Sequence, residues 1–464
     1  MAEQATALQG SIAAIIDGAP VRRIDYWLWL LATGGTLIDG MAVFTLGVAM
    51  PLIITRFAIP PHVQGLLAAA LVFGAVAGAA IGGPAADRLG RRPMMLLDML
   101  IILTGAVISA LATDATMLIA GQLLVGIGVG IDFPVSASYV AEWMPRQIRS
   151  RMMVATIACQ SVGFIVAAAL SLLLVSISHS PALWRWFFFG EAATAALFLL
   201  MRSGLPESAR WLASIGRMAE ARAALARVVA AAPDASLAAA ASTPMRGEAP
   251  GYGVLFSRAY RKRTALAALP WFLMDIATYG VGLFTPVILA AIHFGKTASG
   301  RIAAESVDIK GSGAIDLFLL IGFAIGLFVV PRFGRVRMQV TGLLLMAAAM
   351  GVLFMAVQMP GDSSTKTAWI FAGFVLFNLA MNAGPNSTTF AMASALFPTT
   401  HRASANGLAA AVAKLGATLS VFLLPIIKAD WGVPVVLALM AVVSLLGAAS
   451  TAILNEEIDD GELP

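Results

Sequence analysis

Long apolar stretches, separated by short polar segments, follow one another along almost the whole chain. About twelve such stretches occur, each of about 18 to 28 residues, and a helix needs roughly 20 residues to cross the hydrocarbon core of a bilayer. Strand-length segments of alternating polarity, which are typical of membrane barrels, are missing from this pattern. We therefore predict an all-α membrane protein with twelve transmembrane helices.

The apolar pattern divides the chain into two sets of six spans. In the first half we expect spans at about 26–54, 63–86, 94–112, 116–141, 152–178 and 183–202. In the second half we expect spans at about 264–293, 314–331, 338–358, 367–395, 405–427 and 433–454. The intervening polar segment begins with helical spacing and continues in a composition typical of a flexible linker. The predicted units are an N-terminal six-helix bundle (1–202), a cytoplasmic linker with short surface helices (203–262), and a C-terminal six-helix bundle with a short acidic tail (263–464). A second polar insert, at about 294–313, is expected on the opposite side of the membrane.

Two polar motifs recur at matching places in the two halves. GPAADRLGRR (Gly83 to Arg92) closes the second span, and VVPRFGRVR (Val329 to Arg337) closes the eighth. EWMPRQIR (Glu142 to Arg149) follows the fourth span, and ALFPTTHR (Ala395 to Arg402) follows the tenth. Agreement at both offsets predicts that the two bundles are pseudo-symmetric copies of one unit.

Composition and charge narrow the class of protein further. Hydrophobic residues make up 59% of the chain and charged residues 12%, whereas about a quarter of the residues in soluble domains are charged. The net charge of +5 would also suit a nucleic-acid partner, but the arginines gather in alternate loops, which is the positive-inside pattern with both termini cytoplasmic. Such loops also bind anionic lipid headgroups. The excess of arginine over lysine and the abundant alanine favour a bacterial inner membrane.

An aspartate lies inside one apolar span of each half, about a dozen residues before a proline. Asp39 precedes Pro51, and Asp275 precedes Pro286. A carboxylate at mid-helix costs about 2.5 to 3.5 kcal/mol on insertion scales, so it normally faces a cavity or a partner and marks an ion or substrate path. The matched positions indicate a duplicated transporter.

The charged loop residues suggest a gate that opens when the two halves rock. We assign Asp87, Arg91, Glu142 and Arg149 to a cytoplasmic gate; the alternative is a set of solvated loop charges. The DRLGRR loop resembles the signature loop of the major facilitator superfamily, and PESARWL (Pro206 to Leu212) resembles the motif after the sixth helix in its sugar and metabolite porters. The resemblance covers nearly the whole chain and implies the major facilitator fold.

Four residues of the second half point to one cavity wall. Trp271, Asp275 and Tyr279 are spaced by four and so lie on a single helix face. Lys414 lies deep in the apolar stretch AAAVAKLGATLS, and a buried ammonium needs a protein carboxylate or an anionic substrate as its counter-ion. A structural pair between Lys414 and Asp275 is the alternative, and it does not exclude a role in binding.

These segments resemble those of the phosphate:proton symporters within the superfamily. The seventh, tenth and eleventh helices of that family carry W-x-x-x-D-x-x-x-Y, G-P-N-x-T-T-F and a lysine in a G-K-x-G-A-like setting. Here Gly384 and Pro385 interrupt the tenth span, and Asn386 offers an amide at the break. By position, the resemblance implies an anion site lined by Gln160, Trp271, Asp275, Tyr279, Asn386 and Lys414. It also implies proton-coupling roles for Asp39, Asp132 and Asp275. For Gln160 alone, a hydrogen bond between helices is equally plausible.

The chain departs from that family at three positions. Ala42 stands where the family has a second aspartate in the first helix, Phe133 stands where it has a tyrosine, and Ala395 stands where it has a glutamate. Loss of the tyrosine removes one donor to the substrate, so that a different or larger anion becomes credible. Loss of the glutamate weakens the gate of the second half.

Together these features predict a proton-coupled transporter that imports a small anion, with Asp39 and Asp132 facing the cavity. Inorganic phosphate is the leading substrate, a small organic anion is second, and a neutral sugar or metabolite is third. A sensor that signals without transport is less favoured, because the acidic tail is short. The sequence has no nucleophile-and-base pair, no phosphate-cradling loop and only one cysteine, Cys159, so we expect no enzyme, no metal site and no cofactor besides protons. We expect a monomer without a nucleic-acid partner.

Overall fold

The computed structural model describes residues 12–178, 180, 182–229, 251–282, 318–360 and 364–455, and helices dominate this part of the chain. The first bundle consists of α2 (Arg23–Ala32), α3 (Gly34–Phe57), α4 (Pro61–Leu89), α5 (Arg91–Leu111), α6 (Ala115–Trp143), α7 (Arg146–Ile177) and α8 (Trp184–Arg202). The second bundle consists of α12 (Arg261–Gly282), the helix Phe318–Phe333, α15 (Arg335–Gln358), α16 (Ser364–Ala383), α17 (Pro385–Leu396) and α18 (Arg402–Leu454). Between the bundles lie α9 (Ala209–Ser214), α10 (Met218–Val228) and the short 3-10 helix η1 (Tyr252–Phe256).

Three interruptions determine how these helices form membrane spans. Only Thr33 separates α2 from α3, so the two make one span of 35 residues. Gly384 separates α16 from α17, as the Gly384–Pro385 sequence predicts, because proline lacks the N–H that would continue the helix and fits its first turn. Gly432 divides α18 with a φ of 80°, a conformation that glycine adopts without steric cost. The described helices thus correspond to the twelve predicted spans, of which residues 283–293 of the seventh and 314–317 of the eighth lie outside the described part of the chain.

The repeated loop motif produces the same local structure in both halves. Gly90, with a φ of 105°, separates α4 from α5, which begins at Arg91. Gly334, with a φ of 82°, separates the helix Phe318–Phe333 from α15, which begins at Arg335. Each glycine allows a tight turn between consecutive helices, as the paired motifs predict.

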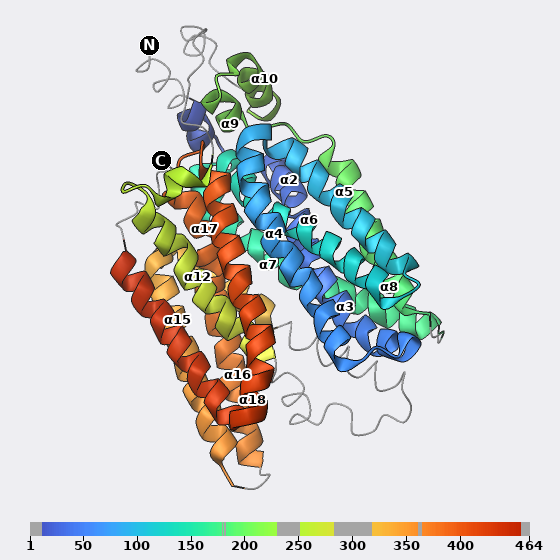
Figure 1. Ribbon diagram of the computed structural model, residues 1–464. Helices are drawn as coiled ribbons and strands as arrows, with labels where there is room; N and C mark the ends of the chain where they lie inside the picture. Colours follow the sequence, from blue (N-terminus) through green and yellow to red (C-terminus); the bar gives the residue numbers. More distant parts are fainter. Residues whose placement is uncertain are drawn as a thin grey trace.

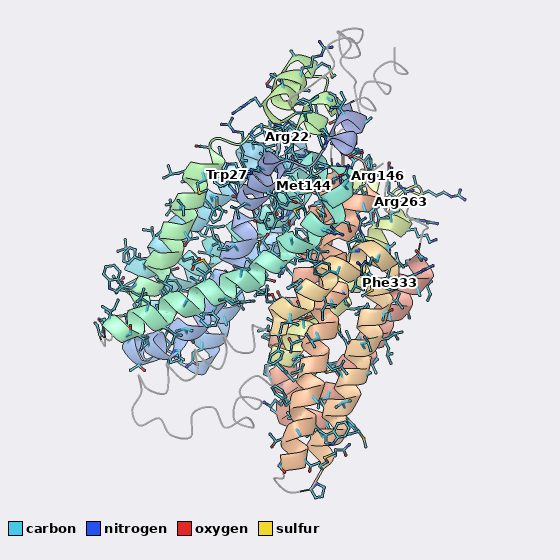
Figure 2. The ribbon with its side chains drawn as sticks, turned by 180° about the vertical axis from the view of Figure 1, so that it is seen from behind. Arg22, Trp27, Met144, Arg146, Arg263 and Phe333 are labelled. Atoms are coloured by element: carbon cyan, nitrogen blue, oxygen red, sulfur yellow. The ribbon has the colours of Figure 1, made fainter. Side chains whose placement is uncertain are left out.

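Figure 1 shows the two bundles side by side, with α9 and α10 beyond one end of the molecule. The two bundles meet where α4 and α6 pack against α18, and where α7 packs against α17. Arg22, Arg146 and Arg263 lie toward the same end as α9 and α10 (Figure 2), which we call the basic end. Most of the predicted flexible linker, the insert at 294–313 and the acidic tail lie outside the described residues.

Candidate substrate site

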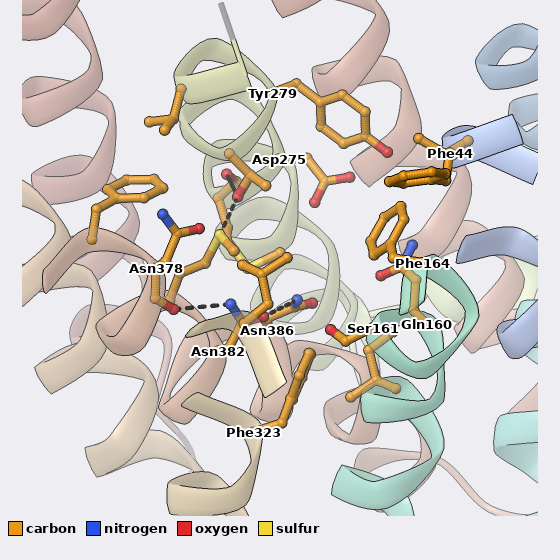
Figure 3. A pocket seen from close by; sticks show the side chains of 18 of the residues that line it. Phe44, Gln160, Ser161, Phe164, Asp275, Tyr279, Phe323, Asn378, Asn382 and Asn386 are labelled. Atoms are coloured by element: carbon orange, nitrogen blue, oxygen red, sulfur yellow. Dashed lines mark hydrogen bonds between the residues drawn. The ribbon is translucent and has the colours of Figure 1, made fainter. Parts of the chain in front are cut away.

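A cavity of about 620 Å³ lies between the two bundles, and both bundles contribute to its walls. Gln160 of α7 lines it from the first half, while Asp275 of α12, Asn386 of α17 and Lys414 of α18 line it from the second. In Figure 3, Asp275 lies between a wall that carries asparagines and an opposite wall that carries Gln160. A site shared by two bundles is what a transporter with alternating access requires.

Trp271, Asp275 and Tyr279 line the cavity together, one above another on α12. Asp275 is only 4% exposed, and its Oδ2 accepts no hydrogen bond from any residue that the structure describes. A buried carboxylate oxygen without a donor is costly, so it favours either a proton or a ligand that can donate to it.

Lys414 is enclosed by aromatic rings and a hydroxyl group. Its Nζ donates to the Tyr279 hydroxyl at 3.2 Å and lies 5.0 Å from the ring centre of Phe133 and 5.5 Å from that of Tyr279. Cation–π contacts of this kind stabilise an ammonium partly. Within the described part of the chain no carboxylate lies within ion-pair distance of Lys414, so the direct pair with Asp275, which the sequence left open as the alternative, is not formed in this conformation. The ammonium remains available to an anion.

Gln160 connects the cavity to Asp39. The Gln160 Nε2 donates to Asp39 Oδ2 at 2.6 Å, and Asp39 is 4% exposed. Gln160 lines the cavity, whereas Asp39 lies behind it on α3. The prediction that Asp39 faces the cavity is therefore wrong for this conformation, in which a single amide separates its carboxylate from the cavity.

Asp132 does not face the cavity, and that prediction is wrong for this conformation. Its Oδ1 accepts from Arg202 Nη2 at 2.8 Å, and Arg202 Nη1 also binds Asp98 Oδ1 at 3.0 Å. Successive helix residues point about 100° apart, so the neighbouring Phe133 lines the cavity while Asp132 points into its own bundle. Arg202 also donates to the carbonyls of Leu31 and Ala32 at the α2–α3 break, so this ion cluster holds the broken helix in place.

The asparagine wall comprises Asn378, Asn382 and Asn386, of which only Asn386 was predicted. Asn378 Nδ2 donates to the Phe374 carbonyl, Asn382 Nδ2 to the Asn378 carbonyl, and Asn386 Nδ2 to Asn382 Oδ1, each at 2.9 Å. Two of these bonds run to the carbonyl four residues earlier, which ties the side chains to their helix. The signal in the sequence is the spacing of four between asparagines in an otherwise apolar span.

At the basic end, Arg91 and Glu142 are the centre of a buried network that joins the bundles. Arg91 Nη2 lies 2.8 Å from Glu142 Oε1 and 3.1 Å from Asp87 Oδ1, and these side chains are fully buried. Arg402 of the second bundle reaches Glu142 at 3.4 Å. Ser404 donates to Asp87 Oδ2 from its backbone N–H at 2.7 Å and from its hydroxyl at 2.6 Å. Three of the four predicted gate residues, Asp87, Arg91 and Glu142, thus lie together. They contact Arg402 and Ser404 of the second bundle, which were not predicted.

Arg149, the fourth predicted gate residue, lies in a different cluster. It pairs with Asp17, which also binds Arg210 of the PESARWL motif. Burial lowers the pKa of Arg210 to about 10, while the carboxylate of Glu142 opposes this shift. The helical segment at 12–18 is therefore tied to the basic end through Asp17.

The helices α4 and α18 approach each other closely beside the gate network. A Cβ on Gly83 would lie 2.4 Å from the Ala403 carbonyl oxygen, and a Cβ on Gly407 would lie 2.5 Å from the Ala79 carbonyl oxygen. Neither position can hold a side chain without moving backbone. The cavity is therefore closed from the basic end by direct helix contact as well as by ion pairs.

Tyr252 of η1 fixes the end of the linker to α4. Pro84 has no N–H, so the Ala80 carbonyl loses its partner within the helix, and the Tyr252 hydroxyl donates to that carbonyl instead. Burial raises the pKa of Tyr252, so the phenol stays protonated and remains a donor. Since η1 also contacts α12 and α18, it links both bundles.

Glu207 of the PESARWL motif binds the N-terminus of α5. Its carboxylate accepts from the backbone N–H of Arg91 at 3.0 Å, of Arg92 at 3.2 Å and of Ser208 at 2.8 Å. Carboxylates are favourable at helix N-termini because the first N–H groups have no partner within the helix. Burial nevertheless raises the pKa of Glu207, and these hydrogen bonds only partly oppose the shift.

Comparison with known proteins places the chain among membrane transporters. The model of the family described as "Sugar (and other) transporter" matches residues 30–458. The inner membrane metabolite transport protein YgcS of Escherichia coli (strain K12) is 29% identical over 436 residues, which cover 94% of this chain and 92% of YgcS. The probable inorganic phosphate transporter 1-9 of Oryza sativa subsp. japonica is 31% identical over 402 residues, which cover 77% of this chain and 68% of that protein.

Solved structures show the same fold. The major facilitator superfamily proton:xylose symporter XylE, bound to 6-bromo-6-deoxy-D-glucose, matches with a TM-score of 0.76 at 19% identity, covering 92% of this chain and 94% of that one. A double tryptophan mutant of XylE matches with a TM-score of 0.79 at 18% identity, covering 95% and 98%. The predicted fold, twelve helices in two six-helix bundles of the major facilitator type, is confirmed.

Proposed function

Since this chain belongs to the family of sugar (and other) transporters, we propose that it is a proton-coupled secondary active transporter that imports a small anion. Transport proceeds by alternating access, in which the two bundles rock around the central cavity. The basic end faces the cytoplasm, because arginine-rich loops remain on that side of the membrane. The conformation described here is then the one that is closed toward the cytoplasm.

The observation that carries this proposal is the environment of Lys414. Its ammonium lies in the cavity wall, 8% exposed, with a hydroxyl and two aromatic rings around it and no carboxylate at ion-pair distance among the described residues. A buried cation without a counter-ion is unfavourable, and an anion that enters the cavity supplies one. A cationic substrate would instead be repelled.

Asp39 and Asp275 are the proposed proton carriers. Asp275 lies in the cavity wall with one oxygen unpaired, and Asp39 is reached through the Gln160 amide. Protonation of either carboxylate removes a buried negative charge beside the incoming anion. If the bound protons outnumber the negative charges of the anion, each net positive charge gains about 2.3 kcal/mol from a potential of 100 mV, which favours import.

Two classes of anion are candidates. Inorganic phosphate is supported by Trp271, Asp275, Tyr279, Asn386 and Lys414, which match the motifs of phosphate:proton symporters, and by the relative named as a phosphate transporter. A larger organic anion is supported by the cavity volume of about 620 Å³, which falls within the roughly 300 to 1,000 Å³ usual for organic ligands. Phe133, in place of the family's tyrosine, also removes a donor to phosphate.

Uptake by the purified protein in proteoliposomes tests the proposal. We expect an imposed proton gradient, acid outside, to drive accumulation of a labelled anion above its outside concentration, and a protonophore to abolish it. The panel comprises phosphate, small carboxylates and neutral sugars. Accumulation of only neutral solutes, or accumulation that a protonophore leaves intact, would contradict the proposal.

A further inference from the structure

The asparagine wall offers hydrogen-bond acceptors that the deprotonated acid group of an anion cannot use. Asn378, Asn382 and Asn386 line the cavity from α16 and α17 (Figure 3). Each uses an N–H within the wall, and Asn382 Oδ1 accepts from Asn386. The Oδ1 atoms of Asn378 and Asn386 receive no hydrogen bond from the described residues. A deprotonated oxyanion only accepts, whereas a hydroxyl group donates and can satisfy these oxygens.

Further acceptors face the cavity from other helices. Asp275 Oδ2 has no donor among the described residues. Gln160 uses its Nε2 for Asp39, which turns its amide into an acceptor toward the cavity. Acceptors therefore come from α7, α12, α16 and α17, while Lys414 is the one cation among the described lining residues. An inventory of this kind matches a ligand with one anionic group and O–H donors spread over several atoms, whereas dihydrogen phosphate carries only two O–H groups, both on one phosphorus.

The size and apolar lining of the cavity also favour an organic ligand. About 620 Å³ is far more than the five heavy atoms of phosphate occupy, and the wall includes Phe44, Phe164, Phe323 and Trp271. Aromatic faces pack against the C–H groups of a carbon chain, so they suit an organic ligand more than a fully hydrated inorganic ion.

From this arrangement we propose that the substrate is a polyhydroxylated organic anion. Its acid group binds at Lys414 and Tyr279, and its hydroxyl groups bind the asparagine wall, Gln160 and Asp275. This inference rests on the proposed function, anion import, and names the class of anion.

Four probes of matched size or charge separate the contribution of the acid-binding residues, Lys414 and Tyr279, from that of the residues that bind hydroxyl groups. Gluconate carries a carboxylate and hydroxyl groups, hexanoate carries the carboxylate alone, sorbitol carries hydroxyl groups alone, and phosphate is the inorganic anion. In the proteoliposome assay, with the flux into protein-free liposomes subtracted because protonated hexanoic acid crosses a bilayer unaided, we expect gluconate to accumulate, and hexanoate, sorbitol and phosphate each to be taken up at least about tenfold more slowly. A site built to bind hydroxyl groups discriminates strongly against analogues that lack them.

Variants of the wall test the assignment of its residues. Asn378→Leu and Asn386→Leu keep approximate size but remove the acceptors, and each should raise the KM for gluconate by about tenfold, the equivalent of one strong hydrogen bond. The protein-dependent part of hexanoate uptake should change little. Thr365→Val, an exposed polar-to-apolar change at the start of the same helix, α16, is the matched control and should leave uptake unchanged. Asn378→Ser, which retains a hydroxyl acceptor, keeps the test valid if the leucine variant fails to fold.

The outcomes distinguish a failure of this inference from a failure of the proposed function. Proton-driven phosphate uptake that gluconate does not inhibit would overturn this inference and leave the proposed function intact. Sorbitol uptake equal to that of gluconate would overturn both, since the charge would then be unimportant. If gluconate is neither transported nor able to raise the Tm of the purified protein, the inference is likewise overturned.

Discussion

Arg402 of α18 and Glu142 of α6 lie 260 positions apart in the chain, yet Nη1 of the one is 3.4 Å from Oε1 of the other. Both side chains are fully buried. Glu142 also accepts hydrogen bonds from Nη2 and Nε of Arg91, at 2.8 and 3.1 Å. One carboxylate thus binds an arginine of each bundle. Alternating access requires this network to break, which makes it a determinant of conformation as well as of stability.

Removal of the Glu142 charge should open the basic end. Glu142→Gln leaves Arg91 and Arg402 without a full counter-charge, and loss of one partner from a buried ion pair costs about 3 to 5 kcal/mol in the closed state. Ser138 meets Asn406 at the interface of the bundles. In a Cys159→Ser, Ser138→Cys background we expect an impermeant maleimide to label the variant about tenfold faster than the parent.

Glu220→Gln is the control for this experiment. Glu220 forms an ion pair with Arg217 at 2.6 Å, but it is 55% exposed, and exposed pairs contribute only about 0 to 1 kcal/mol. The labelling rate should therefore stay at that of the parent. Equal rates in the Glu142 and Glu220 variants would argue against the gate.

Asp39→Asn should separate transport from its driving force. The asparagine keeps a hydrogen bond with Gln160 but has no titratable proton, so we expect loss of accumulation in a pH gradient and retention of exchange between equal concentrations. Asp114→Asn is the control, since Asp114 caps α6 through the Met117 N–H and is exposed. Persistent accumulation in the Asp39 variant would remove this residue from the coupling step.

Disruption of the ion cluster of Asp98, Asp132 and Arg202 should lower the stability of the protein. Arg202→Met leaves two buried carboxylates without their cation and releases the carbonyls at the α2–α3 break, so we expect a loss of about 3 to 5 kcal/mol. Denaturant titration in detergent measures this loss of stability.

Asp132→Asn should reduce stability while keeping proton-driven accumulation. Selective loss of proton coupling in a stable Asp132 variant would restore the role that the sequence predicted.

Glu207 should give the stability of the protein a specific pH dependence. Because its pKa in the folded protein is raised above the usual 4.5, the folded state binds a proton more tightly than the unfolded chain does. The contribution of Glu207 to stability is thus present below pH 4.5 and is lost as the pH rises through the raised pKa. Glu207→Gln should flatten the Tm profile in this window; an unchanged profile would show that other groups cause the dependence.

The sequence predicted those features that depend on local pattern. Spans follow from apolar runs, the break in the tenth span from Gly384 and Pro385, and the shared face of Trp271, Asp275 and Tyr279 from their spacing. The direction in which the Asp132 side chain points depends instead on its ion pair with Arg202, 70 positions away. No local sequence rule predicts such a partner. Arg149 likewise pairs with Asp17, 132 positions earlier.

The asparagine wall was missed for a different reason. Asn378 and Asn382 bond to carbonyls of their own helix, as polar side chains in membrane helices commonly do. Their spacing of four indicates a shared helix face, but it does not distinguish a ligand-binding role from a local one. Only the position of the cavity, which depends on how the two bundles pack, separates these roles.

The central claim is that Lys414 holds the anion, and substitution of this residue tests it most directly. Proton-driven uptake of the labelled anion is measured for the parent, Lys414→Arg and Lys414→Met, each verified by its Tm. We predict a loss of at least about a hundredfold in Lys414→Met, since one partner of a buried charge pair is removed, and partial activity in Lys414→Arg. Uptake by a folded Lys414→Met protein at the rate of the parent would contradict the account.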